Sequence, residues 1–300
     1  MKLIIDELTE EKRIDAYLAE YMHDFSRSKI QSELKQGSVV VNSQKVKPSY
    51  IVKNGDCIEV NIKAEFIKIE PENISIDVVW EDDNMLVVNK PSGMLTHPTN
   101  IETSGTLVNA LLYRYGENLS DINGEFRRGI LHRLDRNTSG LLMIAKNNET
   151  HEFLTEKMKE GSVTKKYLAV VKGKILEDEF SINKPIGRNP VQPHKMAVIE
   201  GGKESISRVK VIERYKDATL LEIQLITGRT HQIRVHMASI AHPVYNDTLY
   251  GFGKIKVKTE EQVLQSYKLS FPKPFDEEII SLQIKPDEKF EKVLNYLKTA

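Results

Sequence analysis

Cysteine is almost absent from the sequence, which contains only Cys57. A single cysteine excludes an internal disulfide and fits a reducing compartment, so we expect a cytoplasmic protein. Long apolar runs are also absent: none approaches the roughly 18 residues of a membrane span, and the N-terminus lacks a signal-peptide pattern. We therefore expect no membrane partner.

The sequence also has no net charge, because 43 Lys and Arg residues balance 43 Asp and Glu residues. Bulk charge therefore gives no argument for a nucleic-acid partner, but the charges are segregated along the chain. Residues 26–53 and 157–174 each carry six basic residues against one acid, whereas residues 65–83 carry one lysine against seven acids. Such separation is typical of a protein with one phosphate-facing surface, although ordinary solvated faces show it too.

Motifs of metal and nucleotide sites are missing as well. Lys90 stands close to Gly93, but the spacing of a P-loop is absent, and Pro91 has no N–H to offer a phosphate. His231 and His236 do not form the HExxH pattern of a zinc helix, and no GxSxG or GxGxxG motif occurs. We expect neither a metal nor another cofactor.

The length of 300 residues predicts two domains. Residues 12–60 contain apolar side chains at helical spacing and then a basic second helix, which Ser26 can cap and Gly37 can end. Short strands are expected to follow at 39–41, 51–52 and 57–60. This order predicts a helix-helix-sheet module. We place the domains at residues 1–63 and 76–300, with a linker at 64–75.

The second domain mixes predicted helices and strands, which makes the fold class α+β. Strands and helices are expected in the following segments: a hairpin at 77–88, helices at 104–115 and 150–160, strands at 164–171 and 218–226, a helix around 233–240, and a strand then a helix in the tail from 276. Residues 182–198 are rich in proline and irregular. They are either a mobile loop over a site or a plain surface connection.

The most informative stretch is residues 129–147, GILHRLDRNTSGLLMIAKN. One carboxylate, Asp135, stands between Arg133 and Arg136 in a turn-forming run that leads into a buried strand. An aspartate held on rigid flanks with cationic neighbours suits a nucleophile or a general base. On these residues alone, an exposed Asp–Arg pair on a surface turn is the commoner explanation, because such pairs are frequent.

The segment HRLDRNTSGLLMIAKN resembles the central motif of the ribosomal large-subunit pseudouridine synthases, the RluA/RluD family. VVNKPSGMLTHP and TGRTHQIRVH resemble two further motifs of that family. The resemblance implies that residues 76–300 are a pseudouridine synthase catalytic domain with a mixed, largely antiparallel central sheet and a cleft. It also implies that Asp135 is the catalytic residue.

Two more site residues follow from the same resemblance. Tyr167 matches an active-site tyrosine in a KxY-type strand, where it would otherwise be a core or rim residue; its ring can replace about 1 to 3 kcal/mol of lost base stacking. Arg229 matches an arginine that pairs with the catalytic aspartate, a task for which a planar guanidinium is suited. Arg133 either fills the space that a base vacates or contacts a phosphate or another part of the chain.

The N-terminal module resembles the RNA-binding module first seen in ribosomal small-subunit protein four, over most of residues 12–60. In such modules the second helix and the following turn face RNA. The resemblance therefore implies phosphate contacts by Arg27, Lys29, Lys35, Lys45 and Lys47. The alternative is that these residues are ordinary solvated side chains.

The sequence thus predicts a cofactor-independent enzyme that cleaves the C1′–N1 bond of a uridine, turns the base and rejoins it through C5. Asp135 would attack the sugar, attack the base or remove a proton, and these roles stay open. We expect large-subunit rRNA or a ribosome assembly intermediate as partner, with another structured RNA as alternative, and a monomeric protein. A non-catalytic assembly factor and a glycoside hydrolase with two carboxylates are the competing functions.

Overall fold

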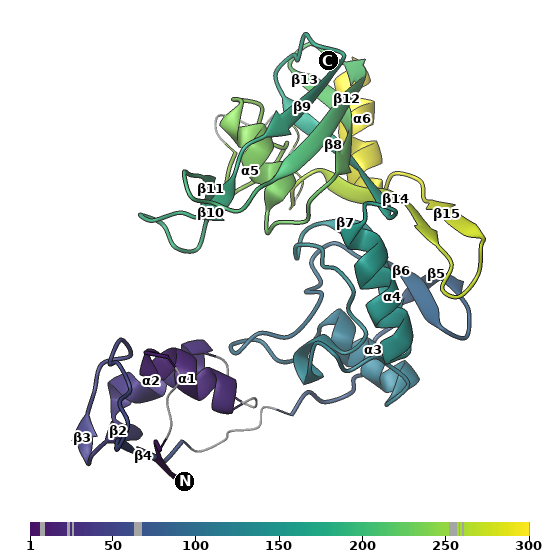
Figure 1. The fold of residues 1–300 in the computed structure, drawn as a ribbon. Coiled ribbons are helices and arrows are strands. Elements are labelled where there is room, and N and C mark those ends of the chain that lie inside the picture. The colour runs from purple at the N-terminus through teal and green to yellow at the C-terminus, as the bar shows by residue number, and fades with distance from the viewer. Residues whose placement is uncertain are drawn as a thin grey trace. The chain divides into compact units, whose positions relative to one another are not determined.

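The computed structural model describes residues 1–6, 10–22, 25, 27–62, 68–251, 257, 259 and 261–299. The chain forms two compact units, Met1–Phe66 and Ile67–Ala300 (Figure 1). No helix in the described part of the chain is long and apolar enough to cross a membrane. The two units are described in turn.

The N-terminal unit contains two helices and a four-stranded antiparallel sheet of order β1-β4-β2-β3. Its elements are β1 (Lys2–Ile4), α1 (Ile14–Tyr21), α2 (Arg27–Gln36), β2 (Val39–Val41), β3 (Gln44–Lys45) and β4 (Cys57–Val60). Ile14 and Leu18 of α1 and Ile30 and Leu34 of α2 are buried together against the sheet, as the helical spacing predicts. The helix-helix-sheet architecture is therefore confirmed.

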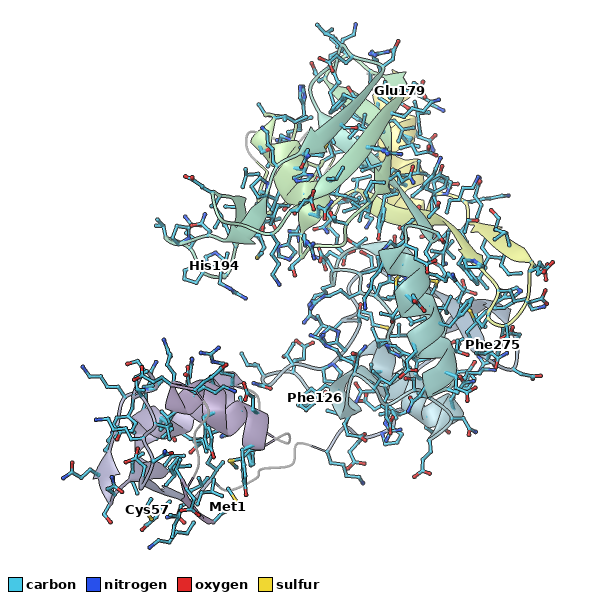
Figure 2. All side chains as sticks on the ribbon, viewed as in Figure 1. Met1, Cys57, Phe126, Glu179, His194 and Phe275 are labelled. Atoms are coloured by element: carbon cyan, nitrogen blue, oxygen red, sulfur yellow. The ribbon has the colours of Figure 1, made fainter. Side chains whose placement is uncertain are left out.

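Four details of this unit differ from the sequence-based expectation or lie beyond it. The strand expected at 51–52 is only a bridge between Ile51 and Arg13. β1 was not expected, because three residues carry too little periodicity to recognise. Cys57 lies on β4 (Figure 2) and is half-buried. The proposed cap Ser26 lies outside the described residues.

The C-terminal unit is built on a nine-stranded sheet, in which β5-β6-β7-β14-β8-β13-β12-β9 are neighbours and β15 pairs with β14. Its elements are β5 (Asp77–Glu81), β6 (Met85–Lys90), α3 (Leu107–Tyr115), the 3₁₀ turn η1 (Glu125–Arg127), β7 (Ser139–Ala145), α4 (Asn148–Lys159), β8 (Thr164–Lys172), β9 (Glu179–Asn183), β10 (Ile186–Arg188), β11 (Met196–Val198), β12 (Ile206–Arg214), β13 (Ala218–Leu225), α5 (Gln232–Ser239), β14 (Leu264–Pro272), β15 (Ile279–Gln283) and α6 (Glu288–Thr299). Only β7 and β14 pair in parallel; the other named pairs are antiparallel. The mixed, largely antiparallel sheet is confirmed.

The position of β14 decides where the central motif lies. β14 comes late in the sequence but is inserted between β7 and β8 (Figure 1). Gly140 makes this possible: its φ is +115°, and a Cβ there would collide with the backbone of Ser266 on β14. Ser266 in turn is the register partner of Tyr167 on β8. The motif and Tyr167 are thus separated by a single strand.

Part of the predicted linker, residues 64–75, packs against the C-terminal unit. Ile69 is buried in the main core of the C-terminal unit, and the backbone N–H of Glu72 donates to the carbonyl of Asn109 at 3.0 Å. The Asn109 side chain donates to the carbonyl of Glu70 at 2.8 Å. Residues 69–72 therefore contact α3. The sequence does not predict these contacts, because a single Ile and an Asn side chain from another segment leave no periodic pattern.

Residues 182–198 also differ from an irregular loop. They contain the end of β9 and a short antiparallel hairpin, β10–β11, whose turn includes Pro190, Pro193 and His194 (Figure 2). The carbonyl of Pro185 accepts from Ile199 N–H at 3.2 Å, so the base of the hairpin is closed. The prolines occupy the turn and the flanks, where a missing N–H costs no ladder hydrogen bond.

Candidate active site

The central motif forms a loop, residues 131–138, that enters β7 and is hydrogen-bonded along its backbone. Thr96 Oγ1 donates to the carbonyl of Leu134 at 2.8 Å. The fully buried Lys90 donates to the carbonyl of Arg136 at 3.1 Å, and Ser92 Oγ to that of Asn137 at 2.9 Å. Asp135 therefore projects from a backbone that is held on both sides.

The C-terminal tail contributes to the same support. Lys289, in the first turn of α6, donates from Nζ to the carbonyl of Asn137 at 3.3 Å and to Ser92 Oγ at 3.1 Å. Ser139, at the start of β7, donates to Asp287 at 2.5 Å. The sequence predicted only a strand and a helix in this tail. Its contribution is mechanical: it ties α6 to the loop that carries Asp135.

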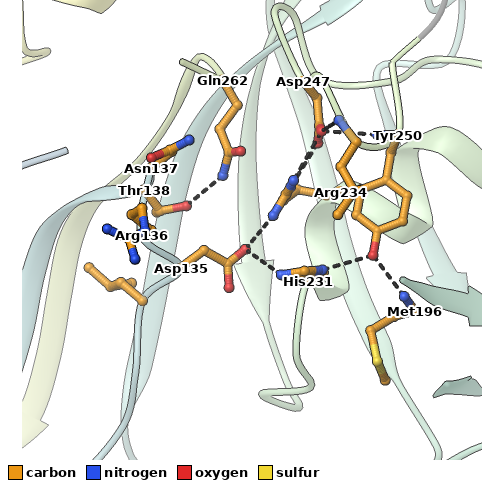
Figure 3. Close-up of polar contacts among 12 residues, drawn as sticks. Asp135, Arg136, Asn137, Thr138, Met196, His231, Arg234, Asp247, Tyr250 and Gln262 are labelled. Atoms are coloured by element: carbon orange, nitrogen blue, oxygen red, sulfur yellow. Dashed lines mark hydrogen bonds and ion pairs between the residues drawn. The ribbon is translucent and has the colours of Figure 1, made fainter. Parts of the chain in front are cut away.

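The Asp135 carboxylate is held by one oxygen only (Figure 3). Its Oδ2 accepts a hydrogen bond from Arg234 Nη1 at 3.1 Å and lies 3.9 Å from His231 Nε2. No partner of Oδ1 occurs among the described residues, and the side chain is 16% exposed. The arrangement leaves one carboxylate oxygen anchored and the other available for a reaction.

Arg234 is itself fixed by a second carboxylate. Its Nε and Nη2 donate to the two oxygens of Asp247 at 2.7 and 3.0 Å, in a bidentate pair. Asp247 also accepts from the backbone N–H groups of Leu249 and Tyr250, at 2.9 and 3.0 Å. The Arg234 guanidinium lies 5.0 Å from the centre of the Tyr250 ring. The contacts with Asp247 and Tyr250 together fix the orientation of Arg234 toward Asp135.

The partner of Asp135 is therefore Arg234, not Arg229 as the sequence analysis expected. Arg229 lies in the turn before α5, where its Nε donates to the carbonyl of Glu204 at 3.0 Å. Arg234 lies two residues into α5 and faces the motif loop. Both arginines occur in TGRTHQIRVH, and the choice between them depends on where the helix starts and which face it turns toward the loop.

His231 precedes α5 in a left-handed conformation with φ of 57°, an uncommon state for a residue with a side chain. Its Nδ1 lies 2.8 Å from the Tyr250 hydroxyl, whose oxygen accepts from Met196 N–H at 2.9 Å. With that oxygen already accepting, the hydroxyl proton is available to Nδ1, which places the ring proton on Nε2, toward Asp135. Burial lowers the pKa of His231, so the ring is neutral.

Tyr167 stands in the wall of the site on β8 and is 5% exposed. Burial raises the pKa of its hydroxyl, and the nearby Asp135 charge raises it further, so the phenol is neutral. Arg133 is exposed beside it. The structure thus brings together Asp135, Tyr167 and Arg133 as expected, and adds His231, Arg234, Asp247 and Tyr250.

Two connected hollows open at Asp135. A crevice of about 50 Å³ is bounded by Thr138, Tyr167, His231 and Arg234, and a cavity of about 260 Å³ adjoins it. Both are lined by Arg133, Asp135, Tyr167, Leu225 and Arg229. Wider grooves of about 490 and 670 Å³ lie along β9 and its neighbours, away from Asp135. In the described part of the chain, no group of three or more His, Cys, Asp or Glu side chains could hold a metal ion.

The basic residues expected to contact RNA in the N-terminal unit fall into two groups. Arg27 pairs with the buried Asp15 at 3.2 Å, and Lys29 pairs with Glu33 at 2.6 Å. Lys35, Lys45 and Lys47 are exposed, and no ion-pair partner of theirs occurs among the described residues. These three lysines are therefore the more available for phosphates.

Comparisons with known proteins identify the family of both units. Residues 84–239, which include Asp135, Tyr167 and Arg234, match the RNA pseudouridylate synthase family, and residues 12–58 match the S4 domain. The chain is 41% identical over 300 residues to an uncharacterized RNA pseudouridine synthase of Aquifex aeolicus, covering 96% of this chain and 95% of that protein.

Other relatives have more specific names. The chain is 39% identical over 284 residues to ribosomal large subunit pseudouridine synthase D of Neisseria meningitidis serogroup B, covering 90% of this chain and 75% of the relative. Among solved structures, human RNA pseudouridylate synthase domain containing 1 superposes with a TM-score of 0.59 at 25% identity, over 76% of this chain and 97% of that one. The chain therefore belongs to the RNA pseudouridylate synthase family and is an RluD-like RNA pseudouridine synthase with an N-terminal S4 RNA-binding domain.

Proposed function

We propose that this synthase isomerises uridines of large-subunit rRNA and that Asp135 is its catalytic carboxylate. The observation that carries the assignment is the asymmetric environment of Asp135: Oδ2 is held by Arg234, Oδ1 has no partner among the described residues, and Tyr167 lines the same crevice. The rRNA substrate is supported by the relatives named ribosomal large subunit pseudouridine synthase D. The proposal includes a monomeric enzyme that acts in the cytoplasm on rRNA or on an assembly intermediate.

The residues around Asp135 have separate tasks in this reaction. The target uridine must leave its stack, which costs a few kcal/mol, and the Tyr167 ring offers a replacement surface. Arg234 binds Oδ2 and holds the carboxylate rotated so that Oδ1 faces the substrate. Oδ1 then attacks the sugar, attacks the base or accepts a proton while the C1′–N1 bond is broken and the C1′–C5 bond is formed. Arg133 fills the vacated space or contacts the RNA backbone.

A glycoside hydrolase mechanism is less compatible with this site. It needs a second placed carboxyl group beside the reacting sugar. The nearest candidate, Asp247, uses both oxygens on Arg234 and does not line either hollow at Asp135. Hydrolysis would also release free uracil, whereas isomerisation leaves the mass of the RNA unchanged.

The test is to map pseudouridines in total rRNA from cells with and without this protein. We expect at least one large-subunit position to lose its pseudouridine and to regain it with the parent gene but not with Asp135→Asn. The amide is nearly isosteric with the carboxylate but is a much weaker nucleophile and base, so RNA affinity should stay within a few-fold. Turnover of purified Asp135→Asn within tenfold of the parent would refute the catalytic assignment. Loss of pseudouridine only in other RNAs would refute the rRNA substrate.

A further inference from the structure

The cavity of about 260 Å³ beside Asp135 contains an excess of positive charge that the reaction at Asp135 does not explain. Its lining includes Arg133, Lys165 and Arg229. The only carboxylate in that lining is Asp135, which Arg234 already neutralises. A cavity with three cations and one compensated anion attracts a further negative charge.

Of the three cations, Lys165 gives the main reason to expect a negatively charged ligand. It lies on β8, two residues before Tyr167, and its Nζ is near Gly228 at the turn before α5. No hydrogen-bond or ion-pair partner of its ammonium occurs among the described residues. Lys165 is half-buried, and this burial lowers the pKa of its ammonium. A partly buried cation without a counter-ion is costly unless a ligand supplies the charge.

Arg133 and Arg229, which line the same cavity, also have N–H donors without partners among the described residues. No hydrogen-bond partner of the Arg133 side chain occurs in the described part of the chain, and only Nε of Arg229 has one, the carbonyl of Glu204. His132, which also lines the cavity, accepts a hydrogen bond from Met143 N–H on Nε2 at 3.1 Å and is kept neutral, since burial lowers its pKa to about 3. The cavity is therefore cationic through its Lys and Arg side chains.

We propose that this cavity is a subsite for one backbone phosphate of the RNA, with Lys165 as its central ligand and Arg133 and Arg229 beside it. The inference rests on the proposed function, because Asp135, Tyr167 and Leu225 line both hollows and so place the phosphate next to the nucleotide that reacts. The phosphate is the one on the 5′ or the 3′ side of the target uridine. Binding it fixes the register of the nucleotide at Asp135.

The subsite can be tested by binding alone, which separates its failure from failure of the proposed activity. Uridine, uridine 5′-monophosphate and uridine 3′-monophosphate are titrated into the full-length parent protein, into Lys165→Met and Lys165→Arg, and into Lys216→Met. Lys216 is an exposed lysine in the turn between β12 and β13 and serves as the matched control. Circular dichroism and thermal unfolding verify that each variant is folded.

We expect the parent and Lys216→Met to bind one of the two monophosphates about tenfold more tightly than uridine, since the phosphate gains a charge-assisted contact. Lys165→Met should remove that preference, and Lys165→Arg should keep most of it. The monophosphate that binds more tightly shows whether the subsite takes the phosphate on the 5′ or on the 3′ side of the target uridine. Equal binding of uridine and both monophosphates by the parent, or an unchanged preference in a folded Lys165→Met, would overturn the proposal.

A second measurement uses an rRNA fragment and needs no turnover. The logarithm of the association constant falls with the logarithm of salt concentration by about 0.7 per neutralised phosphate of a single strand. Lys165→Met should reduce the slope by about this amount, and a single methylphosphonate at the preferred linkage should weaken the parent but hardly affect Lys165→Met. If the methylphosphonate weakens both proteins equally, Lys165 does not contact that phosphate and the proposal fails.

Discussion

Replacement of Arg234 tests the central interaction of the site, because this side chain joins two carboxylates. Arg234 is 8% exposed, Asp247 is fully buried and Asp135 is 16% exposed. Arg234→Met leaves both carboxylates without their counter-charge. Removing one partner of a buried pair costs about 3–5 kcal/mol of unfolding free energy. The backbone donors of Leu249 and Tyr250 still satisfy Asp247 in part, so we expect the lower end of this range.

The effect on the rate comes from the contact with Asp135. A hydrogen bond to a charged group contributes about 1.5–3 kcal/mol, so its loss in the transition state lowers the single-turnover rate about 10- to 150-fold. Arg234→Lys retains the charge but cannot bind Asp247 in a bidentate way and also reach Asp135, so we expect an intermediate rate.

A double variant separates stability from catalysis. In Arg234→Met/Asp247→Asn the uncompensated buried charge is removed, so denaturant unfolding should recover a large part of the lost free energy while the rate stays low. Arg208→Met, at an exposed arginine on β12, is the matched control and should behave like the parent. The single-turnover rates of the parent and these variants at saturating RNA decide the outcome. If the stabilised double variant regains the parent rate, Arg234 acts only on the fold and the reasoning is wrong.

Three further predictions follow from the site and the S4 domain. Tyr167→Leu should remove about 1–3 kcal/mol of stacking on the base and so lower kcat/KM about 5- to 150-fold. An unchanged kcat/KM on folded protein would contradict this. Tyr250→Phe should slow single turnover about two- to tenfold, the effect of one hydrogen bond, and ¹⁵N NMR should show the His231 ring proton leaving Nε2; a parent-like spectrum would exclude the hydroxyl as the group that sets the tautomer. Deletion of residues 1–66 should reduce the salt slope of RNA binding by about 2–3, since Lys35, Lys45 and Lys47 can each neutralise one phosphate and each neutralised phosphate contributes about 0.7–0.9. The remaining unit should still react at high RNA concentration.

Contiguous sequence patterns were sufficient for many of the elements and for part of the site. The helices and strands around residues 14–60 follow from local periodicity, and so do β7, β8 and α4, because side-chain spacing along one segment determines which face is buried. Asp135 and Tyr167 were predicted for a related reason: each lies in a short motif whose residues are neighbours in the chain. Those two assignments remain predictions, but the structure places both side chains in the wall of one cavity.

Other features of the site depend on contacts between distant segments and could not be predicted from the sequence. Arg234 rather than Arg229 meets Asp135, because the start of α5 at Gln232 sets which arginine faces the loop. Asp247 and Tyr250 lie in a segment without periodicity. Met196, whose N–H holds the Tyr250 hydroxyl, belongs to a hairpin that appeared irregular because its prolines lie in the turn and flanks.

By itself, the sequence determined which family the chain resembles, which residue types are available for the chemistry and where many of the regular elements lie. The tertiary structure decided which cation neutralises Asp135, which oxygen of its carboxylate is left free, and that Lys165 has no counter-ion among the described residues. The physical reason is that propensity and periodicity act over a few neighbouring residues. Charge compensation and hydrogen-bond geometry are instead fixed by strand order and helix rotation, here by the insertion of β14 between β7 and β8.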